Sequence, residues 1–353
     1  MRIATLSNAA VIHTRRWVEY FRARGHEVRL WSLEPAPAGL EAERIPTLRL
    51  PGFLRYPSSV PALRRSLADF RPDVVDAHFV PNYGLMGALA GVRPLAVIPW
   101  GSDLLVAGSA DRLRAARTRF VLRRADLIVA DSENLAAAAR ALGGGDRVHA
   151  IPWGIDLARF RPGPARESGL LLSTRMHDHI YDIPTLLNGV APVLAARPGT
   201  SLVVAGAGPL TAEMEALAAR VLPRGRWRFV GRIGPEELAG WLARAEVYLS
   251  ASLSDSTSLS LLEAMGSGAI PVVSDLEGNR EWVAEGDGAR LFPPGDAAMV
   301  TRAVRAALDD PAWADSARRR NRAVVERDAD AVVNMGRIER LYEDLAARRE
   351  RRR

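Results

Sequence analysis

The chain has 353 residues, 48% of them hydrophobic and 25% charged, which is typical of a globular protein long enough for two domains. The absence of cysteine excludes disulfides, thiol nucleophiles and thiolate metal sites. No run of about 18 apolar residues occurs, and the segment MRIATLSNAAVI lacks the apolar core of a signal peptide, so we expect a cytoplasmic protein without membrane-spanning helices.

The formal charge of +7 is unevenly distributed: residues 1–150 hold 21 arginines against 14 acidic residues, whereas residues 151–353 hold 27 of each. Every basic residue is arginine, so a side-chain cation that contacts phosphate must be arginine or histidine. The basic segment 112–124 predicts a helix that could lie against anionic lipid headgroups, with a solvated basic surface as the alternative. No basic stretch is interleaved with aromatic residues, which argues against a nucleic-acid partner.

Strand-like apolar runs alternate with helical patterns almost from end to end, which favours parallel sheets covered by helices on both faces. The first half of the chain predicts six strands, at residues 2–7, 27–33, 73–78, 95–100, 126–132 and 148–153. The next stretch, residues 154–169, is rich in glycine, proline and charge, as is typical of a linker. Six more strands follow, at residues 169–174, 201–208, 227–232, 247–252, 270–275 and 289–294.

This alternation predicts the α/β class, with two doubly wound, Rossmann-like domains that face each other across a cleft and end in C-terminal helices. We place the domains at residues 1–160 and 161–335, and we expect the C-terminal helix and basic tail, 336–353, to pack back on the first domain. Ligands of doubly wound sheets bind beyond the carboxyl ends of the strands. The loops at 250–255 and 274–281 should therefore line the cleft.

One carboxylate stands out in this second half. A helix that begins near Ser258 has apolar residues on nearly all its faces, which predicts that it is buried, yet it carries Glu263. A buried carboxylate is costly without partners. Either Glu263 is paired inside the protein, or it faces a cleft whose occupant carries hydroxyl groups or cations.

Six segments together resemble the family 4 retaining glycosyltransferases of the GT-B fold. They are GHEVRLW, ADLIVADSENLAAAA, VHAIPWGIDLARFRP, LVVAGAGPL, FVGRIGPEELAGWLARAEVYLSAS and LLEAMGSGAIPVVSD, and they extend over nearly the whole chain. The resemblance implies an acceptor-binding first domain and a second domain that binds a nucleotide-sugar.

The signature of that family is a pair of carboxylates eight positions apart, and here Asp255 and Glu263 occupy those positions, with aspartate in place of the usual glutamate. The resemblance implies that Glu263 holds the ribose hydroxyls and that Asp255 reaches the hydroxyls of the transferred sugar. An ionised carboxylate that accepts two hydroxyl hydrogen bonds is well satisfied. A glutamate paired within the core is the alternative for Glu263.

The diphosphate of the donor needs positive charge and N–H donors. Ser258 and Leu259 open the helix, where free backbone N–H groups and the positive end of the helix dipole can accept an anion, and Ser258 replaces a glycine of the family. The family's arginine is matched by Arg175, but Ile180 stands where a lysine is usual. Our candidate for the missing cation is Arg280, with an ordinary surface arginine as the alternative.

Weaker candidates complete the donor site. The resemblance implies that Glu281 opens the next helix near the donor sugar or phosphates, and that Gly206 and Gly208 shape a turn under the nucleotide. The residue after the strand FVG, Arg232, is a further candidate for nucleotide binding.

The first domain should supply the rest of the reaction centre. His13 and Arg16 resemble residues that lie near the donor phosphates in a subgroup of the family. His78 and Asp103 follow strand ends and are catalytic candidates, although a strand-end histidine is as often packed and hydrogen-bonded inside the protein. Trp100 stands where many members of the family have a histidine.

The resemblance implies retaining sugar transfer without a cofactor or a metal ion. We expect UDP as the donor base, with GDP and ADP open, and an acceptor such as a lipid-linked sugar or a polysaccharide precursor at the inner face of the membrane. Two alternatives remain: an epimerase that acts on nucleotide-sugars, and a binding module without catalytic activity.

Overall fold

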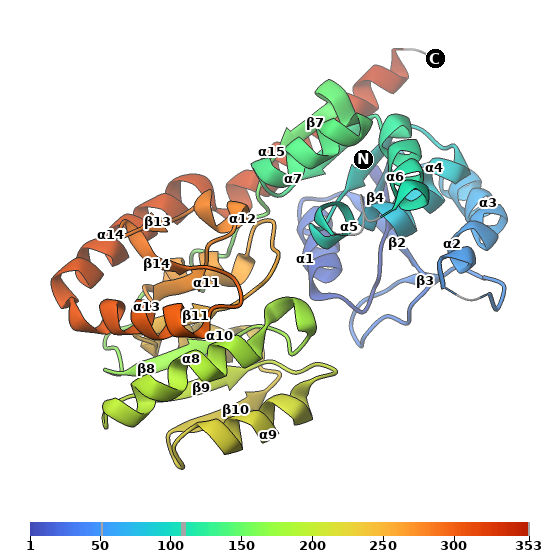
Figure 1. Cartoon of the computed structure of the whole chain (residues 1–353). Helices are drawn as coiled ribbons and strands as arrows, with labels where there is room; N and C mark the ends of the chain where they lie inside the picture. Colours follow the sequence, from blue (N-terminus) through green and yellow to red (C-terminus); the bar gives the residue numbers. More distant parts are fainter. Residues whose placement is uncertain (51, 107–110, 352–353) are drawn as a thin grey trace. The chain divides into compact units, whose positions relative to one another are not determined.

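The computed structural model describes residues 1–50, 52–106 and 111–351, and it divides into two compact units (Figure 1). The first unit is Met1–Pro152 with Met335–Arg353, and the second is Trp153–Asn334. Residues 153–160, which the sequence analysis gave to the first domain, therefore belong to the second unit. The end of the predicted basic tail, residues 352–353, lies outside the described residues.

The first unit is built on a seven-stranded parallel sheet of order β3-β2-β1-β4-β5-β6-β7. Its strands are β1 (Arg2–Leu6), β2 (Glu27–Ser32), β3 (Glu43–Arg44), β4 (Val74–His78), β5 (Leu95–Ile98), β6 (Leu127–Ala130) and β7 (Val148–Ala150). Its helices are α1 (Ile12–Ala23), α2 (Arg55–Ser58), α3 (Val60–Phe70), α4 (Leu85–Ala90), α5 (Ser102–Leu105), α6 (Arg112–Arg124) and α7 (Glu133–Ala139). Short 3-10 or π turns are η1 (Gly52–Leu54), η2 (Phe79–Gly84), η3 (Arg140–Gly144) and η4 (Gly145–Arg147).

The second unit has a parallel sheet of order β10-β9-β8-β11-β12-β14-β13. Its strands are β8 (Leu170–Ser173), β9 (Ser201–Ala205), β10 (Trp227–Gly231), β11 (Val247–Ser250), β12 (Ile270–Ser274), β13 (Ala284–Glu285) and β14 (Gly288–Phe292). Its helical elements are η5 (His179–Tyr181), α8 (Ile183–Ala196), α9 (Thr211–Val221), α10 (Pro235–Arg244), α11 (Leu259–Ser267), α12 (Glu277–Arg280), α13 (Ala297–Asp309) and α14 (Pro311–Asp328).

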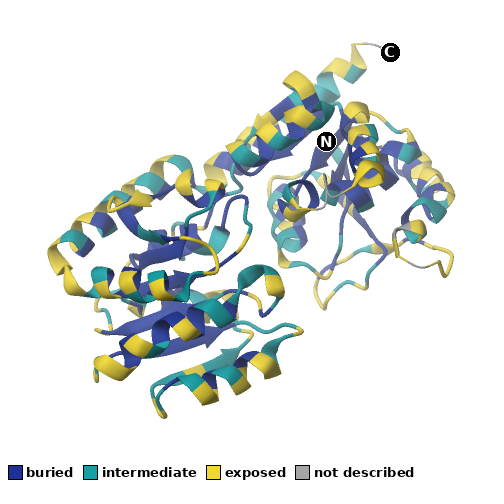
Figure 2. Ribbon diagram, in the orientation of Figure 1, coloured by how far each residue is buried: buried dark blue, intermediate teal, exposed yellow. Residues whose placement is uncertain are grey.

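The central strands of the second sheet, β8, β9, β11 and β12, are buried because helices cover both faces of the sheet. Leu171 and Leu202 pack into one apolar cluster, whereas their chain neighbours Leu172 and Val203 pack into another, as the two-residue period of a strand requires. Figure 2 shows the helices with their buried sides toward the sheet and their exposed sides outward. All twelve predicted strands and the predicted GT-B fold class are confirmed; the two strands that the sequence analysis missed, β3 and β13, have two residues each.

The last helix, α15 (Ala331–Glu350), begins in the second unit and has most of its length in the first. There the Tyr342 ring stacks on Phe21 at 5.4 Å, and its hydroxyl donates to Asp76 Oδ2 at 3.2 Å. Glu339 is bonded to His26 Nε2 at 2.7 Å and accepts from Tyr20 at 3.1 Å. Burial alone would raise the pKa of Glu339, but these partners lower it below its ordinary value. Within the described residues, every helix is too short or too polar to cross a membrane.

Candidate functional site

Arg175 is the centre of a polar cluster beyond the carboxyl end of β8. It is 8% exposed, and its Nη1 donates to Ser258 Oγ at 2.9 Å and to Ser260 Oγ at 2.6 Å. Its Nη2 donates to Asp255 Oδ2 at 2.6 Å, which forms a salt bridge. The structure thus brings together three of the predicted donor-site residues.

Several tyrosine and serine side chains that the sequence analysis missed support Arg175. The Tyr181 ring lies 4.3 Å from the guanidinium carbon, and Tyr248 donates to Ser260 Oγ at 2.8 Å. Burial on its own lowers the pKa of Arg175, but the Asp255 carboxylate and the two tyrosines raise it above its ordinary value. Arg175 therefore remains a cation at every physiological pH.

Helix α11 presents its N-terminus to this cluster. Ser258 is the N-cap residue, and its Oγ accepts a hydrogen bond from the backbone N–H of Leu261 at 3.4 Å, so the predicted helix start is confirmed. The backbone N–H groups of the first turn and the helix dipole create a site suited to an anion. Arg175 reaches the cap itself, which places a cation where an anion would bind.

Glu263 lies on α11 and is 5% exposed, among neighbours such as Leu262 and Ala264 that are fully buried. The prediction of a buried helix that carries a buried carboxylate is therefore confirmed. Asp255 precedes the helix in the loop after β11, and its side chain is 18% exposed. The two carboxylates of the predicted pair thus differ in environment, because water can reach Asp255 more readily than Glu263.

Helix α12 packs on the loop that carries Asp255. A Cβ on Gly278 would lie 1.8 Å from the Ser256 carbonyl oxygen, so only glycine permits this approach. The expectation that Glu281 opens a helix here was wrong: α12 begins at Glu277, and Glu281 is its C-cap residue. The helix starts earlier than the pattern suggested, which brings Gly278 against the loop.

The two other arginine candidates of the second unit lie at the surface. The side chain of Arg280 is 57% exposed and donates from Nε and Nη2 to both oxygens of Asp275, at 2.5 and 2.6 Å. These hydrogen bonds lower the pKa of Asp275. Arg280 is thus the surface arginine that was the alternative above. Arg232 is also exposed, just beyond the end of β10.

Gly206 and Gly208 follow β9 and lie against the loop that carries Arg175. A Cβ on Gly206, which has a φ of +125°, would lie 2.5 Å from the Arg175 carbonyl oxygen, and one on Gly208 would lie 2.3 Å from the His177 carbonyl oxygen. Both glycines are therefore required by protein packing that positions Arg175, whatever the ligand.

Gly208→Ala is expected to lower the free energy of unfolding by about 1–3 kcal/mol, because the new methyl group forces the His177 backbone to move. Chemical denaturation of the purified variant would measure the change. Gly234→Ala is the matched control, since a Cβ there meets nothing within 4 Å and the φ is −75°. Equal stability of the two variants would contradict the prediction.

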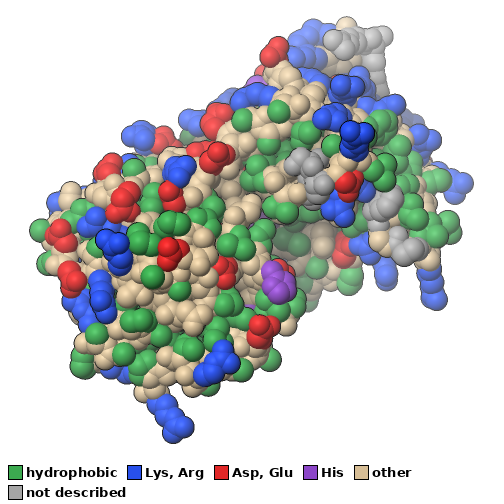
Figure 3. Space-filling model, in the orientation of Figure 1, with side chains coloured by type: hydrophobic (Ala, Val, Ile, Leu, Met, Phe, Trp, Pro, Cys, Tyr) green, Lys and Arg blue, Asp and Glu red, His purple; other side chains and the backbone are tan. Residues whose placement is uncertain are grey.

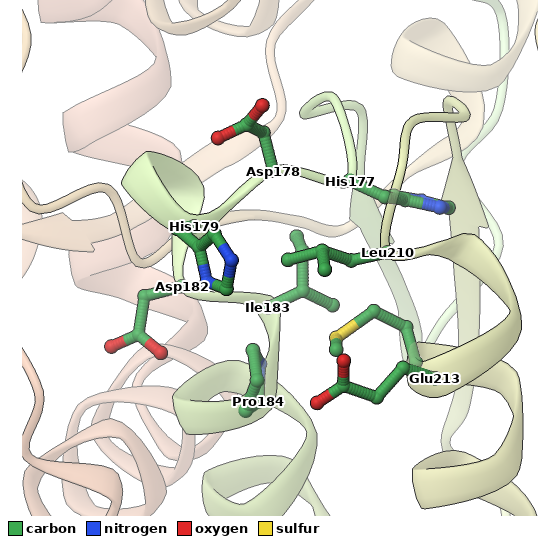
Figure 4. A pocket seen from close by; sticks show the side chains of 9 residues that line it. His177, Asp178, His179, Asp182, Ile183, Pro184, Leu210 and Glu213 are labelled. Carbon is green, nitrogen blue, oxygen red and sulfur yellow. The ribbon is translucent and has the colours of Figure 1, made fainter.

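A small pocket lies at the N-terminal ends of α8 and α9 (Figure 4). Its centre is apolar, and the carboxylates of Asp182 and Glu213 line it together with His179. His177 also contributes to the lining, but its Nδ1 is 3.0 Å from Thr211 Oγ1 and burial lowers its pKa. None of the predicted site residues lines this pocket, although it shares the loop between β8 and α8 with Arg175.

In the first unit, His78 is packed rather than accessible. It is 1% exposed, and its Nδ1 accepts a hydrogen bond from Trp100 Nε1 at 3.1 Å. Because an indole N–H only donates, the proton of the neutral His78 ring lies on Nε2, which faces Asp76 Oδ2 at 3.8 Å. This is the packed, hydrogen-bonded arrangement stated above as the alternative, and a catalytic role for His78 stays a prediction.

Asp103, the other catalytic candidate, ties two loops together. It is fully buried and accepts hydrogen bonds from the backbone N–H groups of Val80 at 2.8 Å and Trp100 at 2.9 Å. Burial raises its pKa to about 6, although these hydrogen bonds oppose the shift. Asp103 thus holds the loops after β4 and β5 in place.

His13 lies edge-on to the half-buried Trp100, with ring centroids 6.1 Å apart. Burial, followed by the charge of Arg16 and the proximity of His78, lowers its pKa to about 4. The structure thus brings His13, His78 and Trp100 together beyond the carboxyl ends of β4 and β5. Asp76, whose Oδ2 lies 3.8 Å from His78 Nε2, was not expected from the sequence, because it reads as one polar residue in an apolar strand.

The shifted pKa values of His13 and Asp103 change the stability of the protein with pH in opposite directions. Between about pH 4 and 6.5 the unfolded chain binds more protons at His13 than the folded chain does, so this group makes the protein less stable as the pH falls. Asp103, with a raised pKa, adds stability as the pH falls through 6. His13→Gln should therefore lose less stability than the wild type between pH 7 and 5 in thermal unfolding. The exposed His149→Gln is the control, and equal losses in His13→Gln and the wild type would contradict the assignment.

Comparison with protein families agrees with this architecture. Residues 8–154 match the model of a glycosyl transferase 4-like domain, and residues 167–310 match that of the glycosyl transferases group 1. The chain belongs to the group 1 glycosyl transferases. Among the described residues of this group 1 glycosyl transferase, no cluster of three or more histidine, aspartate or glutamate side chains could hold a metal ion.

Curated relatives of this group 1 glycosyl transferase include a mannosyltransferase and a glycogen synthase. It is 32% identical over 174 residues to the phosphatidyl-myo-inositol mannosyltransferase of Mycolicibacterium smegmatis, covering 47% of this chain and 44% of the relative. It is 29% identical over 282 residues to a glycogen synthase of Mycobacterium tuberculosis, covering 73% and 64%. The chain thus spans about half to two thirds of the length of these relatives.

Solved structures share the fold. The sucrose-phosphate synthase from Thermosynechococcus elongatus superimposes with a TM-score of 0.82 at 22% identity, over 97% of this chain and 98% of that one. Anabaena HepE in complex with UDP and glucose gives a TM-score of 0.83 at 16% identity, over 98% and 100%. The architecture of this group 1 glycosyl transferase is therefore that of GT-B enzymes along almost its full length.

Proposed function

We propose that the protein is a retaining glycosyltransferase that moves a sugar from a nucleoside-diphosphate sugar to a hydroxyl acceptor. The observation that carries the proposal is the contact of Arg175 with Asp255 and with Ser258 at the N-terminus of α11. A cation and a helix N-terminus suit a diphosphate, and Glu263 on the same helix suits the ribose hydroxyls.

The chemistry of this site is stabilisation of the leaving group. The bond between the anomeric carbon and the β-phosphate oxygen breaks while the acceptor oxygen bonds to that carbon from the same face. The acceptor proton passes to the departing phosphate oxygen. Arg175 and the N–H groups at the start of α11 lower the barrier by binding the charge that develops on the diphosphate. This scheme needs neither a protein nucleophile nor a metal ion.

UDP-sugars are the donors that we propose, with GDP- and ADP-sugars as the alternatives. The support is the fold shared with HepE, which binds UDP and glucose. Because the identity is 16%, the residues that select the base are not carried over from HepE.

The acceptor is proposed to be a lipid-linked or polysaccharide precursor at the inner, cytoplasmic face of the membrane. Five arginines of α6 are exposed, namely Arg112, Arg114, Arg119, Arg123 and Arg124, and Leu113 is 73% exposed beside them. On the face that Figure 3 shows, basic side chains are more frequent than acidic ones over the first unit, whereas the two kinds are interspersed over the second. Such a helix suits an anionic surface. Sedimentation with liposomes tests this contact, which is refuted if anionic lipid gives no binding.

A thermal-shift screen against UDP, GDP, ADP and their sugar conjugates, with and without EDTA, tests the donor proposal. A ligand that binds only the folded protein raises the unfolding midpoint. We expect a shift with UDP and its conjugates that survives EDTA, and donor consumption once an acceptor is added. No shift with any nucleotide would refute the proposed function, and a shift without sugar transfer would favour a binding module.

A further inference from the structure

The salt bridge between Arg175 and Asp255 occupies the position where a donor diphosphate would find its cation. The guanidinium already makes two bonds to serine hydroxyls through Nη1 and one to the Asp255 carboxylate through Nη2. Its Nε is buried and has no hydrogen-bond partner. An arriving diphosphate thus meets a cation whose charge is already balanced by Asp255.

We propose that Asp255 is the counter-ion of Arg175 until a donor binds and that the donor's diphosphate displaces it. The carboxylate released in this way then becomes available to the hydroxyls of the transferred sugar. This inference rests on the proposed function. It gives Asp255 a further role, which is to neutralise the charge of Arg175 before the donor binds.

The surroundings of the pair favour exchange of the carboxylate rather than movement of the arginine. Nη1 is held by Ser258 and Ser260, and Ser260 is held in turn by the buried Tyr248 at 2.8 Å. Asp255 is the more accessible member of the pair, with its side chain 18% exposed against 9% for that of Arg175. The guanidinium therefore stays in place while Asp255 can turn toward solvent.

The charges around Arg175 also favour the exchange. Ile180 stands five residues after Arg175 and brings no cation, and Arg280 is engaged with Asp275. With one arginine in the cluster, a diphosphate and Asp255 compete for the same N–H donors. The diphosphate carries more negative charge and more acceptor oxygens, so it takes the cation. This competition weakens the binding of the free nucleoside diphosphate, which helps the product to leave.

Titration calorimetry of pyrophosphate and UDP against the wild type and Asp255→Asn tests the exchange. Removing the competing charge should raise the affinity for both pyrophosphate and UDP roughly tenfold, equivalent to about 1.4 kcal/mol. Turnover of UDP-sugar should fall in the same variant. Asp309→Asn is the matched control, because it removes a carboxylate paired with Arg197 on the surface of the same unit and should leave both affinities unchanged.

Stability gives a second measurement of the same exchange. Asp255→Asn leaves Arg175 without its counter-ion and should lower the unfolding midpoint. Pyrophosphate should then raise the midpoint of this variant more than that of the wild type, because it supplies the missing negative charge. Asp255→Glu keeps the counter-ion and should bind pyrophosphate as the wild type does.

The outcomes separate this inference from the proposed function. If Asp255→Asn binds pyrophosphate and UDP no more tightly than the wild type, the exchange is refuted, and weaker binding of UDP-sugar alone would make Asp255 simply a sugar ligand. If the wild type binds neither pyrophosphate nor any nucleoside diphosphate, the proposed function falls as well.

Discussion

Replacing Arg175 by methionine is expected to lower the rate of sugar transfer roughly 100- to 1,000-fold, the usual effect of removing one donor that stabilises a developing negative charge. Methionine keeps much of the length and the apolar stem but carries no charge. The loss should appear in kcat/KM for the donor identified by the nucleotide screen. Arg197→Met, which removes a surface arginine of the same unit, is the control.

The same substitution should destabilise the protein. Removing one member of a buried ion pair costs about 3–5 kcal/mol. Asp255 is partly accessible to water, so we expect the lower end of that range or less, measured by urea unfolding. Transfer within threefold of the wild type, in a folded variant, would show that Arg175 serves packing alone.

Glu263→Gln is expected to weaken the binding of UDP and UDP-sugar roughly 10- to 100-fold, since a hydrogen bond to a charged group contributes about 1.5–3 kcal/mol. Glutamine retains the shape of the side chain but has one acceptor oxygen and no charge. Because Glu263 is 5% exposed, few water molecules can replace the lost interaction. Calorimetry gives the affinities, and the exposed Glu285→Gln is the control.

A comparison of UDP with 2′-deoxy-UDP tests whether the weaker binding of Glu263→Gln comes from the ribose. The wild type should bind UDP more tightly than 2′-deoxy-UDP, and this difference should shrink in Glu263→Gln, because the variant has lost the carboxylate that accepts from the 2′-hydroxyl. The same difference in both proteins would instead indicate that Glu263 is paired inside the core and does not touch the nucleotide.

The fold could be predicted because twelve strands are long and apolar enough to stand out between helical patterns. The strands β3 and β13 could not, since two exposed residues carry no alternation. Edge strands of this length are defined by the neighbour with which they pair.

The donor-site cluster was predicted only in part. Arg175, Asp255 and Ser258 stand at positions to which the family resemblance points, and the structure places Arg175 within hydrogen-bond distance of the other two. Tyr248 was missed because it is a single hydroxyl in an apolar strand, and Ser260 because it is one of five hydroxyl side chains between residues 254 and 260. Their importance arises from contacts between β11 and α11, which no local pattern encodes.

The surroundings of the two catalytic candidates in the first unit could not be predicted for a related reason. His78 and Asp103 do follow strand ends, as predicted, but strand-end position alone says nothing about which way a side chain turns. Both side chains accept hydrogen bonds inside the protein: His78 from Trp100, and Asp103 from two backbone N–H groups.

The division of the chain also determines the order in which it can fold during synthesis. The first unit contains residues from both ends of the sequence, and Phe21 and Asp76 meet Tyr342 only after α15 has been made. The second unit lies wholly between these segments and can close its sheet while the ribosome is still adding residues. The unit that emerges first is therefore completed last, and until then its Asp76 carboxylate lacks the tyrosine that covers it.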